Sequence, residues 1–123
     1  MNNEFDMQYQ EYDLAIAKII ECRKDFEIIT YIKNLFLEKE IKFIVSIASR
    51  DLKTSKRKIY EILSLMIENK ILFHVSILTF RLNPYMIIPF GFNGEDLQKE
   101  WDELIKNRKK EIKNLKQTKP QQN

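Results

Sequence analysis

One stretch, residues 46–69, constrains the fold of this chain more than any other. Its sequence, SIASRDLKTSKRKIYEILSLMIEN, predicts a short helix, a tight turn and a longer second helix. Apolar residues of the second helix recur at offsets of three, four, seven and eight, which places them on one face at about 3.6 residues per turn. These residues are Ile59, Ile62, Leu63, Met66 and Ile67. Thr54 or Ser55 can supply the N-cap oxygen of this helix.

The opposite, outward face of the second helix is polar and begins with positive charge. It carries Arg57, Tyr60, Glu61 and Ser64. Five basic residues stand between positions 50 and 58 against the single acid Asp51, namely Arg50, Lys53, Lys56, Arg57 and Lys58. Recognition helices present their first turns to base edges and phosphates in the major groove of DNA. The stretch therefore predicts a helix-turn-helix unit with a recognition helix.

The distribution of charge along the chain supports this interpretation better than the net charge of +3 does. Residues 1–45 hold six basic and nine acidic side chains, whereas residues 46–82 hold seven and three. A solvated helix end in a lysine-rich protein is the alternative. However, lysines at a helix N-terminus oppose the helix dipole, and a phosphate partner would remove that cost.

Composition indicates one soluble domain with a core of its own. The chain has 123 residues, of which 44% are hydrophobic and 32% charged, and only two Gly and three Pro. These values favour a mainly helical domain. Cys22 is the only cysteine, which excludes an internal disulfide and favours a reducing compartment. The polar N-terminus is unlike a signal peptide and no apolar run is long enough to span a membrane, so we expect a cytoplasmic protein.

The sequence contains no pattern that predicts an enzyme. It has no phosphate-binding glycine loop and no set of residues typical of nucleophilic catalysis. His74 is the only histidine and has no second His or Cys nearby, so we expect it to cover the sheet and not to bind a metal. We therefore expect no cofactor and no small-molecule substrate.

Two amphipathic helices are expected before the basic stretch, after about eight loose residues. The first spans residues 9–21, and the second begins at the N-cap Asp25 and ends near Leu37. Their apolar residues are Tyr12, Ile16, Ile19 and Ile20 in the first, and Phe26, Ile29, Ile32, Leu35 and Phe36 in the second. The β-branched run 41–45 favours a strand, with Ser46 as the N-cap of the next helix. The start of that helix is the alternative.

A hairpin and a long helix are expected after the basic stretch. Residues 71–83 are rich in β-branched and aromatic residues, which favours two strands with a turn around residues 76–79. Residues 85–90 continue as an extended segment to Gly91. Asn93 then caps a helix over residues 94–116, with acids in its first half and bases in its second. Its apolar residues Leu97, Trp101, Leu104 and Ile105 should pack against the core, although a homodimer interface would use the same residues.

This order of elements predicts a winged helix-turn-helix, mainly helical with a small β-hairpin as the wing. The expected organisation is an N-terminal helical extension (1–24), a winged-helix domain (25–92), a C-terminal helix (93–116) and a disordered tail (117–123). The lysine-rich residues 106–119 form either a solvated helix end or a contact with the DNA backbone.

One segment resembles a known family. The run Phe80-Arg81-Leu82-Asn83-Pro84-Tyr85-Met86-Ile87-Ile88 is similar to the strand, Asn-Pro and aliphatic segment that closes the winged helix of RepL-type plasmid replication proteins. In that family a glycine and a charged helix follow, as Gly91 and residues 94–116 do here. The resemblance covers residues 25–104. The chain differs from the family in the turn of the helix-turn-helix, where Leu52 or Lys53 replaces the usual glycine.

The resemblance implies a DNA-binding protein of plasmid replication initiation or copy control. We expect Lys53, Lys56, Lys58 and the wing residue Arg81 to contact phosphates, and Thr54, Arg57 and Tyr60 to read bases, with Arg50 and Ser55 in the same surface. A transcriptional regulator of phage or plasmid origin is one alternative. A winged-helix module that binds protein and not DNA is another.

Overall fold

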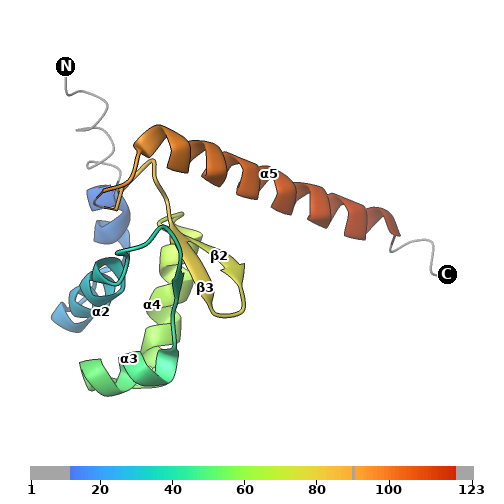
Figure 1. Ribbon diagram of the computed structural model, residues 1–123. Coiled ribbons are helices and arrows are strands. Elements are labelled where there is room, and N and C mark those ends of the chain that lie inside the picture. The colour runs from blue at the N-terminus through green and yellow to red at the C-terminus, as the bar shows by residue number, and fades with distance from the viewer. Residues whose placement is uncertain (1–11, 90, 119–123) are drawn as a thin grey trace.

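The computed structural model describes residues 12–89 and 91–118, which are mainly helical with a small three-stranded antiparallel sheet (Figure 1). Residues 12–19 are helical. The elements that follow are α2 (Arg23–Asn34), β1 (Ile41–Lys42), α3 (Val45–Leu52), α4 (Lys56–Glu68), β2 (Leu72–Ser76), β3 (Thr79–Leu82) and α5 (Gly94–Thr118). Each helix in these ranges is too short or too polar to cross a membrane.

The sheet has the strand order β1-β3-β2, so the first strand pairs with the last. Ile41 lies opposite Phe80, and Phe73 lies opposite Arg81. The hairpin turns at Ile77 and Leu78, as the sequence predicts, and its register is irregular between His74 and Ser76. The pairing of β1 with β3 brings the chain before α3 next to the hairpin.

One hydrophobic core joins residues 12–19, α2, α3, α4 and the sheet. The face predicted for α4 is confirmed, because Ile59, Ile62, Leu63 and Met66 are buried and Ile67 is half-buried. These residues share the core with Ile32 and Phe36 of the preceding segment, and with Tyr12, Ala15 and Ile19 of the first helix. The first helix is therefore part of the same core. The predicted loose residues 1–8 and the predicted helix start at residue 9 lie outside the described residues.

The prediction for α2 is wrong at its start, its end and part of its buried face. Cys22 is the N-cap residue, and Asp25 lies in the first turn of a helix that ends at Asn34. Its buried residues are Asp25, Ile28, Ile29 and Ile32, at the three- and four-residue spacing of one helix face. Phe26 lies off that face and is 54% exposed, and Leu35 after the helix end is 38% exposed.

The predicted strand 41–45 is only two residues long. β1 ends at Lys42, and α3 begins at Val45 with Ile44, not Ser46, as its N-cap residue. The Ile44 carbonyl accepts the N–H groups of Ile47 and Ala48, both at 3.2 Å. Because Ile44 closes the first helical turn, the run splits between a strand and a helix.

The segment after the hairpin turns where extended chain is expected. Residues 84–86 form a turn, and hydrogen bonds to Asn83 hold this turn in place. Its carbonyl accepts from the N–H groups of Met86 and Ile87 at 3.0 Å, and its side-chain oxygen accepts from Tyr85 at 2.9 Å. Its amide donates to the Lys70 carbonyl at 2.7 Å, which ties the segment to the end of α4.

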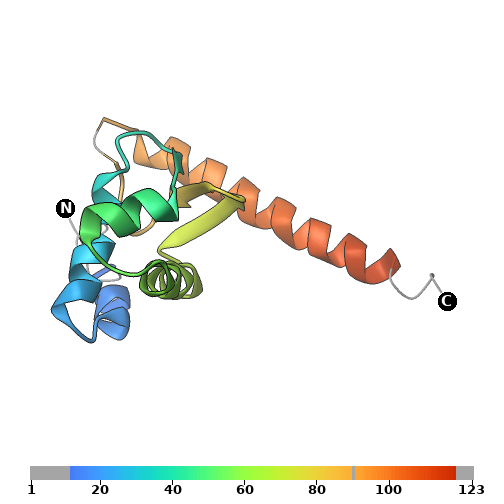
Figure 2. The ribbon, with the colours of Figure 1, turned by 90° about the horizontal axis from the view of Figure 1, so that it is seen from below.

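The long helix α5 begins as predicted and continues slightly further. The Asn93 side chain accepts from the Asp96 N–H at 3.2 Å, and the helix extends to Thr118, so two residues of the predicted tail are helical. The remaining tail residues lie outside the described part of the chain. Leu97 and Trp101 are buried, while Leu104 and Ile105 are half-buried. The second half of α5 projects away from the rest of the fold in both views (Figures 1 and 2).

Candidate nucleic-acid interface

The turn between α3 and α4 is tight because Lys53 adopts a left-handed conformation. Its φ is 53° and its ψ is 50°, a region that favours glycine. The Thr54 N–H donates to the Ser49 carbonyl at 3.1 Å and closes the turn. The Ser55 hydroxyl then accepts from the Lys58 N–H at 3.1 Å, so Ser55 is the N-cap of α4. Lys53, and not Leu52, is therefore the residue of this turn in the conformation that favours glycine.

Most of the predicted DNA-binding residues are exposed at the end of α3, in the turn and in the first turns of α4. Arg50, Lys53, Ser55, Lys56, Arg57 and Tyr60 are exposed, and Thr54 is half-buried. Lys53, Lys56 and Arg57 form no ion pair with any residue that the structure describes. Arg50 is held by its neighbour Asp51, with Nε 3.4 Å from the carboxylate. The positive charge of Lys53, Lys56 and Arg57 is therefore available to a partner.

Lys58 does not belong to this surface, in contrast to the prediction. Its Nζ lies 2.7 Å from the Asp25 carboxylate, whose side chain is only 2% exposed. Burial alone would raise the pKa of Asp25. The hydrogen bonds from Lys58, from the Glu21 N–H and from the Cys22 side chain together outweigh burial and lower that pKa. The hydrogen bond to Asp25 in turn raises the pKa of Lys58. Lys58 thus links α4 to the start of α2.

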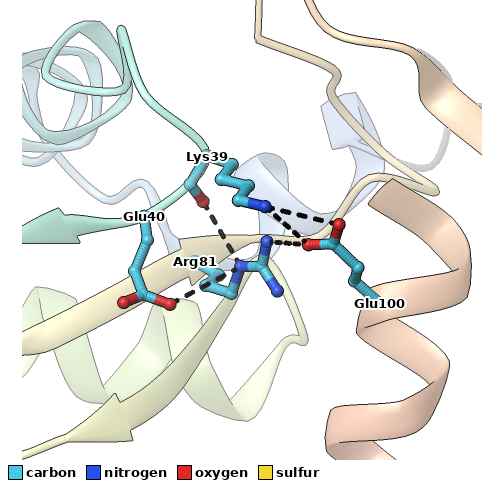
Figure 3. Close-up of polar contacts among 4 residues, drawn as sticks. All are labelled: Lys39, Glu40, Arg81 and Glu100. Atoms are coloured by element: carbon cyan, nitrogen blue, oxygen red, sulfur yellow. Dashed lines mark hydrogen bonds and ion pairs between the residues drawn. The ribbon is translucent and has the colours of Figure 1, made fainter. Parts of the chain in front are cut away.

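Arg81 is also withdrawn from the predicted interface, because it is 8% exposed and bonded to α5 (Figure 3). Its Nη2 donates to the Glu100 carboxylate at 2.6 Å, and its Nε lies 3.9 Å from Glu40. Lys39 Nζ lies 3.3 Å from the same Glu100 carboxylate. The hydrogen bond from Arg81 lowers the pKa of Glu100 although partial burial opposes the shift. Arg81 therefore fixes α5 against β3.

The predicted wing is the β2–β3 hairpin, and the tip of this hairpin is apolar and not basic. Ile77 is 87% exposed and Leu78 is 43% exposed. A groove of about 510 Å³ separates the hairpin from α4, and Ile44, Tyr60 and Ile77 are among its lining residues. Sequence reasoning missed this groove, although two large aliphatic residues at a hairpin turn are a visible signal.

His74 lies on the sheet as predicted. Its ring stacks on Phe80 with centroids 4.7 Å apart, and its Nε2 is 3.0 Å from the Ile77 carbonyl. Within the described residues, no group of three or more His, Cys, Asp or Glu side chains could hold a metal ion.

A second groove, of about 550 Å³, lies between the end of α4 and α5. Its apolar lining includes Ile67, Leu72, Trp101 and Ile105, and three lysines, Lys70, Lys106 and Lys109, also line it. Trp101 is fixed there by an edge-to-face contact with Phe73, with centroids 5.7 Å apart. Because Trp101 is already buried within its own chain, it offers little surface to a second copy.

Comparisons with protein-family models, with curated proteins and with solved structures find no match to this chain.

Proposed function

We propose that the chain is a winged-helix protein that binds double-stranded DNA with α4 as its recognition helix. The observation that carries this proposal is the exposed positive charge of Lys53, Lys56 and Arg57, which no acid of the described chain pairs, at the start of a helix whose opposite face is buried. The element order β1-α3-α4-β2-β3, with the strand order β1-β3-β2, is compatible with a winged helix.

The three cations would have different tasks on DNA. Lys53 and Lys56 flank the helix start and would contact phosphates, which fix position without reading sequence. Arg57 lies on the outward face, where a guanidinium can donate two hydrogen bonds to guanine O6 and N7. Tyr60, 57% exposed about one turn further on, would contact sugar or base.

The biological role proposed for this DNA binding is plasmid replication initiation or copy control. That role rests on the resemblance of residues 80–88 to RepL-type proteins and not on the geometry of α4. A phage or plasmid transcriptional regulator would use the same surface. The location of the preferred sequence, in a replication origin or in a promoter, distinguishes the two roles.

Affinity for duplex DNA at several salt concentrations tests the proposal. Lys56→Ala should weaken binding to all duplexes and lower the salt slope by about one, because one phosphate contact is lost. Arg57→Ala should cost about 1–3 kcal/mol on a duplex selected from a random pool and much less on an arbitrary duplex. If neither variant changes DNA binding, α4 is not a recognition helix.

The apolar hairpin tip favours a second candidate function, a module that binds protein. Exposed Ile44, Ile77 and Leu78 line the groove beside α4, and exposed apolar patches commonly mark interaction sites. Replacing Ile77 and Leu78 by Ser separates the candidates. A DNA-binding protein should keep its DNA affinity within roughly twofold, since neither side chain carries charge. A protein-binding module would lose its partner.

A further inference from the structure

The groove between α4 and α5 lies at the far end of α4 from the proposed reading surface, and it too is basic. Lys70, Lys106 and Lys109 line it, and none of them pairs with an acid among the described residues. The only acid in its lining, Asp102, accepts the Tyr85 hydroxyl at 2.7 Å. Three cations and one carboxylate therefore line the groove, which leaves its lining with a net charge of +2.

This groove and the groove beside the hairpin share Ile67 on α4. Both grooves therefore border one side of α4, which runs from Lys56 to Ile67, and Lys70 lies just beyond the end of the helix. α4 itself runs from Lys56 to Glu68, which are 12 positions apart, and this corresponds to about 18 Å at about 1.5 Å per residue. The major groove is about 12 Å wide, so this length suffices to reach from the backbone of one strand to that of the other.

We propose that Lys70, Lys106 and Lys109 bind phosphates of the DNA strand opposite to the one that Lys53 and Lys56 contact. This inference rests on the proposed DNA binding by α4 and extends it to α5. Two side chains fix α5 to the sheet: Arg81 donates to Glu100 at 2.6 Å, and Arg108 donates to the His74 carbonyl at 3.2 Å. The lysines on α5 are therefore held in place before DNA binds, and the chain clamps both edges of the groove that α4 enters.

The test compares two double variants of α5 that remove the same charge. Lys106→Ala/Lys109→Ala removes two lysines that line the groove. Lys99→Ala/Lys110→Ala removes two exposed lysines of the same helix that do not line this groove. Ala is a good helix former, so both variants should keep α5, and circular dichroism and thermal unfolding check this.

Affinity for an arbitrary duplex of about 30 base pairs, roughly three helical turns, is measured against salt concentration. The groove variant should lower the salt slope by about two, because two phosphate contacts are lost at about 0.9 each. It should keep the sequence preference that depends on Arg57. The control variant should keep the wild-type slope. On the duplex selected from a random pool, hydroxyl-radical footprinting should show one protected backbone segment missing with the groove variant alone.

Two results would overturn the inference in different ways. If wild-type protein binds DNA with an Arg57-dependent preference but both double variants behave alike, only the clamp is wrong. If wild-type protein does not bind duplex DNA, the function proposed for α4 fails together with the clamp. Labelled polyglutamate provides a further probe. Binding of polyglutamate that depends on Lys106 and Lys109, with an unchanged DNA slope, would assign this groove to an acidic protein partner and reject the clamp.

Discussion

The ammonium group of Lys58 lies 2.7 Å from the buried carboxylate of Asp25, on the first turn of the helix proposed to read DNA. Lys56, two residues earlier on the same helix, is exposed and lines the groove beside the hairpin. Neighbouring residues of one basic cluster thus have opposite environments. One lysine joins two helices, and the other faces solvent.

The two lysines should respond to replacement in opposite ways. Lys58→Ala should lower the melting temperature, because it leaves the Asp25 carboxylate buried without its cation. Its DNA affinity at a temperature where it is folded should have the wild-type salt slope. Lys56→Ala should keep the melting temperature and lose about one unit of slope. A stable Lys58→Ala protein with a reduced slope would mean that Lys58 leaves Asp25 to contact DNA.

Stability should fall in acid, and Asp25 should account for part of the fall. The folded-state pKa of Asp25 is lowered below the ordinary value of 3.8, and that of Glu100 is lowered below 4.5. A carboxyl group whose pKa is lowered by folding stabilises the fold above its unfolded pKa, and this contribution is lost as pH falls through the folded value. The free energy of unfolding in urea should therefore decline below about pH 4.5.

Asp25→Asn provides the comparison for this pH dependence. The variant should be less stable at pH 7, because the neutral amide loses the ion pair with Lys58, and the difference from wild type should shrink towards pH 2. A constant difference across this range would show that the charge of Asp25 does not stabilise the fold.

The buried face of α4 should dominate the stability of the fold. Ile62 is 1% exposed in the core shared by α2 and α4, so Ile62→Ala should lower the free energy of unfolding by roughly 2–5 kcal/mol. Tyr60, 57% exposed, is the control, and Tyr60→Ala should change it by less than about 0.5 kcal/mol. Equal losses in urea unfolding would mean that the helix faces are misassigned.

The sequence predicted correctly those features that depend only on residues close together in the chain. The buried face of α4, the Ser55 cap and the Asn93 cap were all visible in the sequence, because each involves residues a few positions apart. Phe26 was wrongly assigned to the buried face because the apolar residues of α2 occur at several positions around the helix axis. Only packing against the other helices selects the phase of Ile28 and Ile29, which buries Asp25 as well.

The roles of Lys58 and Arg81 could not be predicted from sequence, because their partners are distant. Asp25 lies 33 positions before Lys58, and Glu100 lies 19 positions after Arg81. A basic residue on a predicted DNA-binding element is expected to face DNA until the fold places an acid beside it. Lys53, Lys56, Arg57 and Tyr60 have no such partner among the described residues and stay candidates for DNA contact, whereas Lys58 and Arg81 are each paired with an acid.

Lys53 provides a test of the turn that places α4. A side chain in the left-handed region costs roughly 1 kcal/mol relative to glycine, while glycine makes the unfolded chain more flexible. Lys53→Gly should therefore be as stable as wild type or more stable by up to about 1 kcal/mol. Lys53→Val should be less stable by about 1–2 kcal/mol, because β-branched residues are poorly accommodated at the observed φ of 53°.

Lys53→Asn separates conformation from charge, since asparagine tolerates the left-handed region and carries no charge. It should keep wild-type stability in urea and lose the same share of DNA affinity as Lys53→Gly, because both remove one phosphate contact. If Lys53→Gly is strongly destabilised, the turn does not have the left-handed geometry. If the Gly and Asn variants both bind DNA as tightly as wild type, Lys53 shapes the turn and does not contact phosphate.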